Sequence, residues 1–442
     1  MEENKNLLIR LLSSFQKQEG LDDLLLMVEH PNGFKRENAI RRLGMLGNPI
    51  ALPKLIVRMN DWVPQVREVA KEALLNLMTS KNAEAFAESL PDLYHLNICS
   101  RDNHERFIDD VIRYLLEEEN REFIRSAVFS PAPKVARIAV RLCFDYSLID
   151  RAELVKKCLS HPDVLVRNIA AHHLREFSAK PLDTLLKIAI RDPFMPIRRE
   201  AFQIYLRNNP GLGQVIANTF LFDRHISIRE IAISYLQKNG IDVKEIYAAI
   251  LSDENQTPSR KKYSILGLGY LGASDKIQAI LLNMDSKYPS IRKSVIQALE
   301  KLLAEEVKPL LITALNDQSP SVAKESSRLI AKLKLRFDSN EIIKTIDIQC
   351  NPHALSLIVR VMSKSNKWER LLFLLKTLSI IVKNDAPYVE MIRSELVKWD
   401  ADFNRSCSQP TDLQMQMIKI EYNNCSYLLN EAQKRSIEFT LK

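Results

Sequence analysis

A short pattern that recurs about every 31 residues constrains this chain more than any other feature. It consists of a turn with Asp and Pro, an aliphatic residue followed by Arg, and an apolar residue three positions later. Asp61–Ala70 shows it in full, and 161–170, 192–201 and 223–232 repeat it closely. The Arg, or the residue aligned with it, falls at positions 36, 67, 106, 137, 167, 198, 229, 260, 292 and 323. A fixed period of this length predicts a solenoid, in which each repeat packs on its neighbours.

Each repeat is predicted to contain two helices. Residues 181–190, before one turn, and 228–236, after another, both place apolar side chains at i, i+3, i+4 and i+7. Proline in the turn suits the first turn of a second helix, where its missing N–H costs nothing. The chain has only 10 glycines in 442 residues, against a usual share of about 7%, which leaves little room for tight hairpins. We therefore predict an all-α protein, a right-handed α-solenoid of about ten helical-hairpin repeats with a divergent helical C-terminal region.

The Asp…Pro…Val-Arg…Ala signature resembles the HEAT repeat, in the short form common in bacterial and phycobilisome-lyase-like proteins. The resemblance covers roughly residues 20–334. It implies an α-solenoid that binds proteins, and sometimes nucleic acids, on a curved surface.

The resemblance also implies that the turn Asp and the Arg bridge neighbouring repeats. The pairs Asp61/Arg67, Asp192/Arg198 and Asp223/Arg229 are expected to bond within or across repeats, charge-assisted and partly buried. The alternative is that the arginines bind a ligand. The predicted structural ladder consists of Asp61, Arg67, Arg167, Asp192, Arg198, Asp223, Arg229 and Arg292.

Three regions are predicted along the chain. Residues 1–20 contain an N-terminal capping helix, because a terminal repeat would otherwise expose apolar surface. Residues 21–334 form the array of about ten repeats. Residues 335–442, where the period is lost, form the divergent helical region, with helices expected around 353–363, 367–383 and 387–399.

The array breaks once, between Arg67 and Arg106, where the step is 39 residues. Irregular positions in a regular array are better candidates for function than regular ones. Consecutive turns line up along one edge of a solenoid, so the unusual turn residues there are expected to form one surface cluster for a partner. The cluster consists of Trp62, Arg101, Asp102 and His104. The alternative is a longer loop with the Trp packed on the next repeat.

A second candidate surface is basic. Positions one and five after the marker Arg fall on one side of each second helix, and late in the chain many of them are cationic. This basic track consists of Arg199, Lys261, Lys293, Lys324 and Arg328. An acidic peptide or a phosphate backbone would fit it, and solvated surface charge is the alternative.

Charge and cysteine usage suggest a compartment. The net charge of +8, from 63 basic and 55 acidic residues, is spread along the chain without a basic tail. No signal-peptide or membrane-span pattern occurs, and the six cysteines are widely spaced, as is typical of reduced core residues. We predict a cytoplasmic protein without membrane association.

Motifs for catalysis are missing from the sequence. The stretch Gly267–Gly272 fits G-x-G-x-x-G, but no strand precedes it, so the end of a helix and a turn are expected there. The single His104-Glu105 dipeptide argues against the di-iron deoxyhypusine hydroxylases, which use several. Trp62 with Asp61, Arg101 and Arg106 is only distantly similar to the site of HEAT-like alkylpurine DNA glycosylases. We predict no catalytic residue, no metal and no cofactor.

The predicted function is a non-enzymatic protein-interaction scaffold or adaptor, whose partner is another protein of unknown identity. The first alternative is a nucleic-acid-binding protein that uses the basic track. The second is a lyase-like or chaperone-like helper of the phycobilisome type, which only the repeat resemblance favours.

Overall fold

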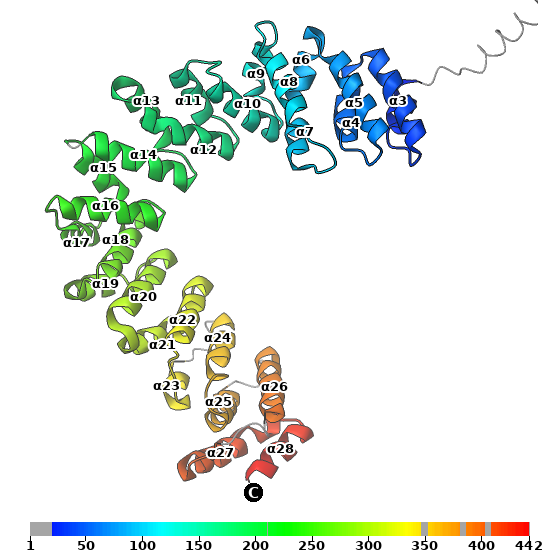
Figure 1. The fold of residues 1–442 in the computed structure, drawn as a ribbon. Helices are drawn as coiled ribbons and strands as arrows, with labels where there is room; N and C mark the ends of the chain where they lie inside the picture. The colour runs from blue at the N-terminus through cyan, green and yellow to red at the C-terminus, as the bar shows by residue number, and fades with distance from the viewer. Residues whose placement is uncertain (1–19, 210, 346–351, 381–385, 403–407, 442) are drawn as a thin grey trace, which may run out of the picture. The chain divides into compact units, whose positions relative to one another are not determined.

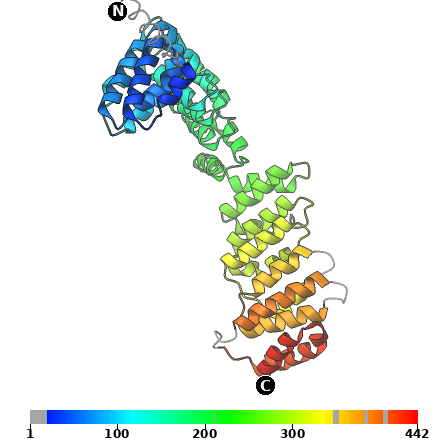
Figure 2. The same cartoon turned by 90° about the vertical axis from the view of Figure 1, so that its right-hand side faces the viewer.

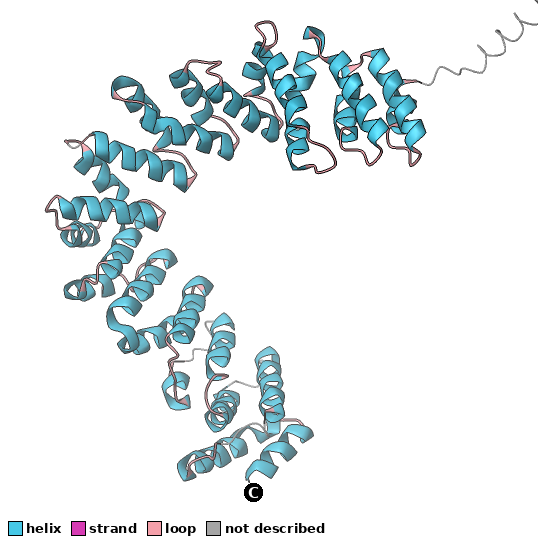
Figure 3. Ribbon diagram, viewed as in Figure 1, coloured by secondary structure: helices cyan, strands magenta, loops and turns pink. Residues whose placement is uncertain are grey.

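The computed structural model describes residues 20–209, 211–345, 352–380, 386–402 and 408–441. Within these ranges the chain forms helices and loops, and no strand (Figure 3). It divides into two units, Met1–Gly213 and Gln214–Lys442, each a stack of helical hairpins (Figure 1). The prediction of an all-α solenoid is confirmed.

In the first unit, each regular repeat pairs a first helix with a second helix that follows the turn. The pairs are α2 (Leu21–Met27) with α3 (Gly33–Leu46), α4 (Leu52–Arg58) with α5 (Pro64–Leu77), α9 (Arg121–Ala127) with α10 (Pro133–Asp145), α11 (Arg151–Leu159) with α12 (Val164–His172), and α13 (Ala179–Ala189) with α14 (Met195–Asn208). The irregular repeat has α6 (Ala83–Glu88), α7 (Leu90–His95) and the 3₁₀ turn η3 (Leu96–Ile98) before α8 (Glu105–Leu116). These extra elements account for the 39-residue step.

The second unit continues the same pattern, and its hairpins stack one on the next (green to red in Figure 2). The helices are α15 (Gly213–Phe220), α16 (Ile226–Lys238), α17 (Val243–Ser252), α18 (Pro258–Tyr270), α19 (Ile277–Leu281), α20 (Pro289–Leu303), α21 (Lys308–Leu315), α22 (Pro320–Lys332), α23 (Ser339–Ile343), α24 (Pro352–Met362), α25 (Lys367–Ile380), α26 (Ala386–Ala401), α27 (Asp412–Cys425) and α28 (Glu431–Leu441). The helices predicted after residue 335 correspond to α24, α25 and α26. The predicted capping helix lies outside the described residues, and the domain boundaries stay a prediction.

Local sequence explains where the second helices begin. Pro64, Pro133 and Pro289 each stand in the first turn of a second helix. Asp163 caps α12 by accepting hydrogen bonds from the N–H groups of Leu165 and Val166. Because such a cap satisfies N–H groups that the helix leaves unpaired, the turn and the helix start are set by the same few residues.

Buried apolar side chains form a continuous core along the first unit, from Leu24 to Ile204. The small residue three positions after the marker Arg is fully or almost fully buried in repeat after repeat, as at Ala39, Ala70 and Ala201. An alanine there lets neighbouring second helices approach closely. The core therefore continues from one hairpin to the next, which holds the turns in register along one edge.

Candidate protein-binding surfaces

The turns of neighbouring repeats are joined by buried arginine–aspartate pairs. Arg36 donates through Nε and Nη2 to the two carboxylate oxygens of Asp61, at 2.9 and 2.7 Å. Its Nη1 donates to the main-chain oxygens of His30 and Pro31, at 2.8 and 2.9 Å. One guanidinium thus holds the carbonyls of its own turn and the carboxylate of the next turn, 25 residues further on.

The same arrangement recurs along both units. Arg167 contacts Asp192, and Arg292 contacts Asp317, each at 2.7 Å and each 25 residues apart. Arg137 contacts Asp163, 26 residues away, at 2.7 Å. Two-pronged, charge-assisted bonds of this kind fix orientation as well as distance. We call each such pair a rung.

The predicted pairs Asp61/Arg67, Asp192/Arg198 and Asp223/Arg229 were expected to bond within or across repeats, and they bond within the repeat. Arg67 donates to the main-chain oxygen of Asp61 at 2.8 Å, and Arg198 and Arg229 do the same to Asp192 and Asp223, at 2.7 and 2.8 Å. Within a repeat the Arg therefore binds the carbonyl of the turn Asp. The carboxylates of Asp61 and Asp192 bind the Arg of the preceding repeat instead.

Two of the rungs lower the pKa of their carboxyl groups, those of Asp61 and Asp163. Burial acts to raise the pKa of Asp61, but hydrogen bonds from Arg36, from the Val63 N–H and from Arg58 outweigh it, and the pKa lies below its usual value. The hydrogen bond from Arg137 is the main cause that lowers the pKa of Asp163 to about 2. Both carboxylates are ionised at neutral pH.

Acid is expected to weaken the rung at Asp163. The pKa is lower in the folded chain than in the unfolded chain, so the unfolded state takes up protons first as the pH falls. The resulting stability is present above about pH 4 and is lost as the pH falls towards 2. In urea unfolding at pH 6 and pH 3, we expect D163N to lose less stability between the two pH values than the wild type. An equal loss in both would contradict this role of Asp163.

Trp62 and Arg101 meet at the irregular part of the array. Arg101 reaches back from the loop before α8, donating through Nη1 to the main-chain oxygen of Asn60 at 2.9 Å and through its N–H to Asn60 Oδ1 at 3.2 Å. Trp62 is 67% exposed, and the Arg36 guanidinium lies 5.3 Å from its ring centroid. Trp62 and Arg101 line one hollow of about 370 Å³, together with residues of α4, α7 and η3. We call it the Trp62 hollow.

The other two members of the predicted cluster lie apart from this hollow. Asp102 is exposed, and its carboxylate lies 3.6 Å from Nε of Arg67. His104 stands at the start of α8 and is only 4% exposed, so it does not present its ring on the surface as expected. Burial is the main cause that lowers the pKa of His104, which favours the neutral ring.

The basic track is divided between the two units. Arg199 is exposed on α14 in the first unit, whereas Lys261, Lys293 and Lys324 lie on α18, α20 and α22 in the second. Part of the charge is neutralised, because Glu325 lies 2.6 Å from Arg328 and 3.6 Å from Lys293. The hydrogen bond from Arg328 is the main cause that lowers the pKa of Glu325 to about 2.

Sequence reasoning missed four further cations beside Lys324 and Arg328. They lie in one groove with these two residues, two in the segment after α22, one on α24 and one just after α24. The missed residues are Lys334, Arg336, Arg360 and Lys364. Three of them follow the point where the repeat marker is lost, and the signal that the sequence offered was the i, i+4 spacing of Arg360 and Lys364 at the end of the helix predicted around 353–363.

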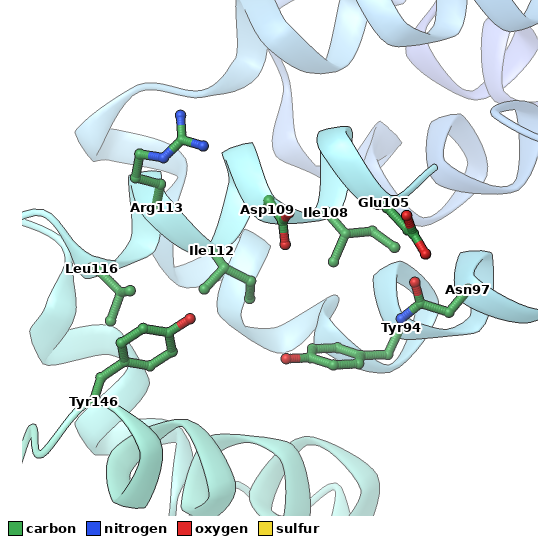
Figure 4. A pocket seen from close by; sticks show the side chains of 9 residues that line it. All are labelled: Tyr94, Asn97, Glu105, Ile108, Asp109, Ile112, Arg113, Leu116 and Tyr146. Carbon is green, nitrogen blue, oxygen red and sulfur yellow. The ribbon is translucent and has the colours of Figure 1, made fainter. Parts of the chain in front are cut away.

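A third hollow lies along α8 and has a volume of about 580 Å³. Tyr94 and Tyr146 point into it from opposite sides, facing Ile108 and Ile112 (Figure 4). Burial is the main cause that raises the pKa of Tyr94, so its hydroxyl stays protonated at neutral pH. The polar groups here can form hydrogen bonds with a ligand, but they do not include a nucleophile beside a base.

The described ranges contain no group of three or more His, Cys, Asp or Glu residues placed to hold a metal ion. They also contain no helix with the length and apolar character needed to cross a bilayer.

Comparisons with known proteins find a likeness to helical solenoid structures. No family model matches the chain, and no curated protein matches it. Among solved structures, it is similar to the karyopherin Kap121p bound to the extreme C-terminus of the phosphatase Cdc14p, with 12% identity and a TM-score of 0.35 over 84% of this chain and 49% of that one. It is also similar to Kap95p in a structure with RanGDP, with 12% identity and a TM-score of 0.33 over 97% of this chain and 64% of that one.

A third similar structure is YibA of E. coli, with 17% identity and a TM-score of 0.22 over 74% of this chain and 97% of that one. The chain spans about half the length of the Kap121p structure that it matches. The assignment of the fold rests on the helical hairpins and rungs described above, and the chain is an all-α solenoid to which these structures are similar.

Proposed function

We propose that the chain is a non-enzymatic scaffold that binds another protein at the Trp62 hollow. The observation that carries this proposal is the position of Trp62, which is 67% exposed in the turn before α5 and lines one hollow with Arg101 of the irregular repeat. Tryptophan and arginine, together with tyrosine, are enriched among the few residues that carry most of the binding energy of a protein interface.

The surroundings of Trp62 support this proposal because they hold its turn in place. The preceding residue, Asp61, is fixed by Arg36, and Asn60 is fixed by Arg101. A surface that is already ordered loses little conformational entropy when a partner binds. The guanidinium of Arg36, packed near one side of the indole ring, leaves the rest of the ring available to the partner.

The test is a capture experiment from cell lysate with the purified chain, with and without nuclease, at low salt and at ~300 mM salt. We expect a discrete protein partner that survives both treatments, and we expect W62A and R101E to reduce its capture at least about tenfold. M45A is the matched control. Met45 is 84% exposed and lies at the C-terminal end of α3, away from the turn that contains Asp61.

The outcomes separate the scaffold from the nucleic-acid alternative. Capture that is lost with W62A and kept with M45A supports the proposal. Capture of nucleic acid alone, lost at the higher salt, would contradict it, because contacts to phosphates weaken steeply as salt rises. Equal capture by W62A and the wild type would remove the Trp62 hollow as the binding surface.

A further inference from the structure

A groove of about 630 Å³ runs between α22 and α24 in the second unit. Its apolar lining residues come from both helices and from the segment between them, and include Ile330, Leu335, Leu357 and Val361. Ile330 is buried, and the other three side chains are half-buried, so part of their apolar surface is open to solvent. We call this site the α22–α24 groove.

Cations surround this apolar floor. The exposed basic residues that line the groove are Lys324, Arg328, Lys334, Arg336, Arg360 and Lys364. None of the twelve lining residues is acidic. Among the described residues, no carboxylate lies within ion-pair distance of Lys324, Lys334, Arg360 or Lys364, whereas Arg328 is held by Glu325 and Arg336 donates to the main-chain oxygen of Lys364.

The sequence spacing explains why apolar and cationic groups alternate here. On α24 and just after it, Leu357, Arg360, Val361 and Lys364 are spaced i, i+3, i+4 and i+7, so they share one face. On α22, Lys324, Arg328 and Ala331 share a face in the same way. The groove is therefore lined by two amphipathic helix faces, each of which carries both apolar and cationic side chains.

We propose that the α22–α24 groove binds an acidic amphipathic helix of another protein. The apolar side of the helix, with anchors at i, i+3, i+4 and i+7, would lie on the floor, and its flanking Asp and Glu side chains would face the rim. This proposal rests on the proposed scaffold function, and it adds a second surface with a partner of stated chemistry. Charge complementarity supports an acidic partner, since six cations and no carboxylate line the groove, and Lys324, Lys334, Arg360 and Lys364 have no ion-pair partner among the described residues.

The lining favours a peptide helix over a nucleic acid. A sequence-tolerant site for single strands combines basic groups with aromatic side chains on which bases stack. The twelve residues that line this groove include no aromatic side chain. The exposed parts of Leu335, Leu357 and Val361 would gain nothing from a phosphate backbone, but they would gain from contact with an apolar helix face.

The experiment measures binding of labelled synthetic peptides to the purified full chain by fluorescence anisotropy. The probe is a helical peptide with Leu at i, i+3, i+4 and i+7 and Glu at most other positions. The control peptides are the same composition in scrambled order and the same stripe with Lys in place of Glu. A single-stranded and a double-stranded DNA oligonucleotide complete the set. We expect the acidic amphipathic peptide to bind at least about tenfold more tightly than each control.

Variants locate the binding site. R360E is expected to weaken binding of the acidic amphipathic peptide about fivefold or more, and L357Q should weaken it as well. K287E is the matched control, since it makes the same kind of charge reversal at an exposed turn in the same unit and is expected to leave binding unchanged. Far-ultraviolet circular dichroism and thermal unfolding check that each variant folds.

Several results would overturn the proposal. The scrambled and striped acidic peptides could bind equally well, or the striped acidic peptide could fail to bind at concentrations up to ~200 µM. R360E and K287E could weaken binding equally. An oligonucleotide could bind more tightly than the acidic peptide and lose its affinity with R360E. The scaffold proposal fails separately, because capture of the lysate partner depends on Trp62 and is measured without these peptides. A W62A-sensitive partner together with an empty groove would leave the scaffold standing and remove only this inference.

Discussion

Replacing Asp61 by Ala is expected to destabilise the first unit by about 3–5 kcal/mol, as is typical when one partner of a buried ion pair is removed. The side chains of Asp61 and Arg36 are each only 2% exposed, so the guanidinium left behind would be buried without its counter-charge. The Val63 N–H and Arg58 would also lose their acceptor. Urea unfolding followed by circular dichroism measures the loss.

Asp102 provides a matched control in the same unit. Asp102 faces Arg67, the marker Arg of the preceding repeat, just as Asp61 faces Arg36. Its side chain, however, is 48% exposed, and its carboxylate lies 3.6 Å from Nε of Arg67. Exposed pairs contribute little because water and salt screen them, so D102A should cost less than about 1 kcal/mol. D61N, which keeps an oxygen acceptor but no charge, should fall between the two. Equal losses for D61A and D102A would show that burial does not determine the strength of a rung.

The second large effect is expected at Gly267, in the interior of α18. A Cβ atom there would lie 2.2 Å from Cε2 of Tyr247, far inside van der Waals contact. The Tyr247 ring is fully buried, packs edge-on against Phe222, and donates to the main-chain oxygen of Leu221 at 3.3 Å, so it has little freedom to move away. Alanine is the better helix former by about 1 kcal/mol, but overpacking of this kind costs about 1–3 kcal/mol. We therefore expect G267A to lower the stability of the second unit.

A second substitution tests the cause of that loss. Shortening the ring in the double variant G267A/Y247L makes room for the new methyl group, so Y247L should cost less in the G267A background than in the wild type. Thermal unfolding of the four proteins completes the cycle. G211A is the control for the substitution itself, because nothing lies within 4 Å of the position of its Cβ. A G267A variant as stable as the wild type would show that the close approach of Tyr247 does not require glycine.

The sequence period was enough to predict the solenoid and the existence of charged links between repeats. It did not show which oxygen each arginine binds, because that depends on the offset between neighbouring hairpins. The side chain of Arg36 crosses to Asp61 of the next turn, whereas Arg67, close to Asp61 in sequence, reaches only its carbonyl. The glycines of 267–272 illustrate the same limit. Gly272, with φ of +62°, lies in the turn after α18 as expected, but Gly267 is glycine because of a residue twenty positions earlier in the chain.

The candidate sites were predictable where they depend on the edge of the array. Trp62 and Arg101 meet because consecutive turns lie next to each other along that edge. The sequence places His104 close to Arg101 and Asp102, but its side chain is buried at the start of α8. Neighbouring residues of one turn can differ completely in exposure, and the sequence alone does not show which of them is buried. In the α22–α24 groove, Lys324 and Arg328 follow the marker and were predicted, whereas Arg336, Arg360 and Lys364 lie beyond it, so their grouping with α22 depends on how α24 packs against that helix.

Because the rungs join neighbouring turns in the same way, one hairpin can replace another or be added to the array. The turn at 163–167 offers Asp163 to Arg137 of the preceding repeat and Arg167 to Asp192 of the following repeat, so one turn carries complementary connectors for both neighbours. An extra hairpin inserted between α11–α12 and α13–α14 would need its own aspartate for Arg167 and its own arginine for Asp192, together with apolar faces that continue the core. Such a chain can grow or shrink by whole repeats through duplication or deletion without any change to the neighbouring connectors.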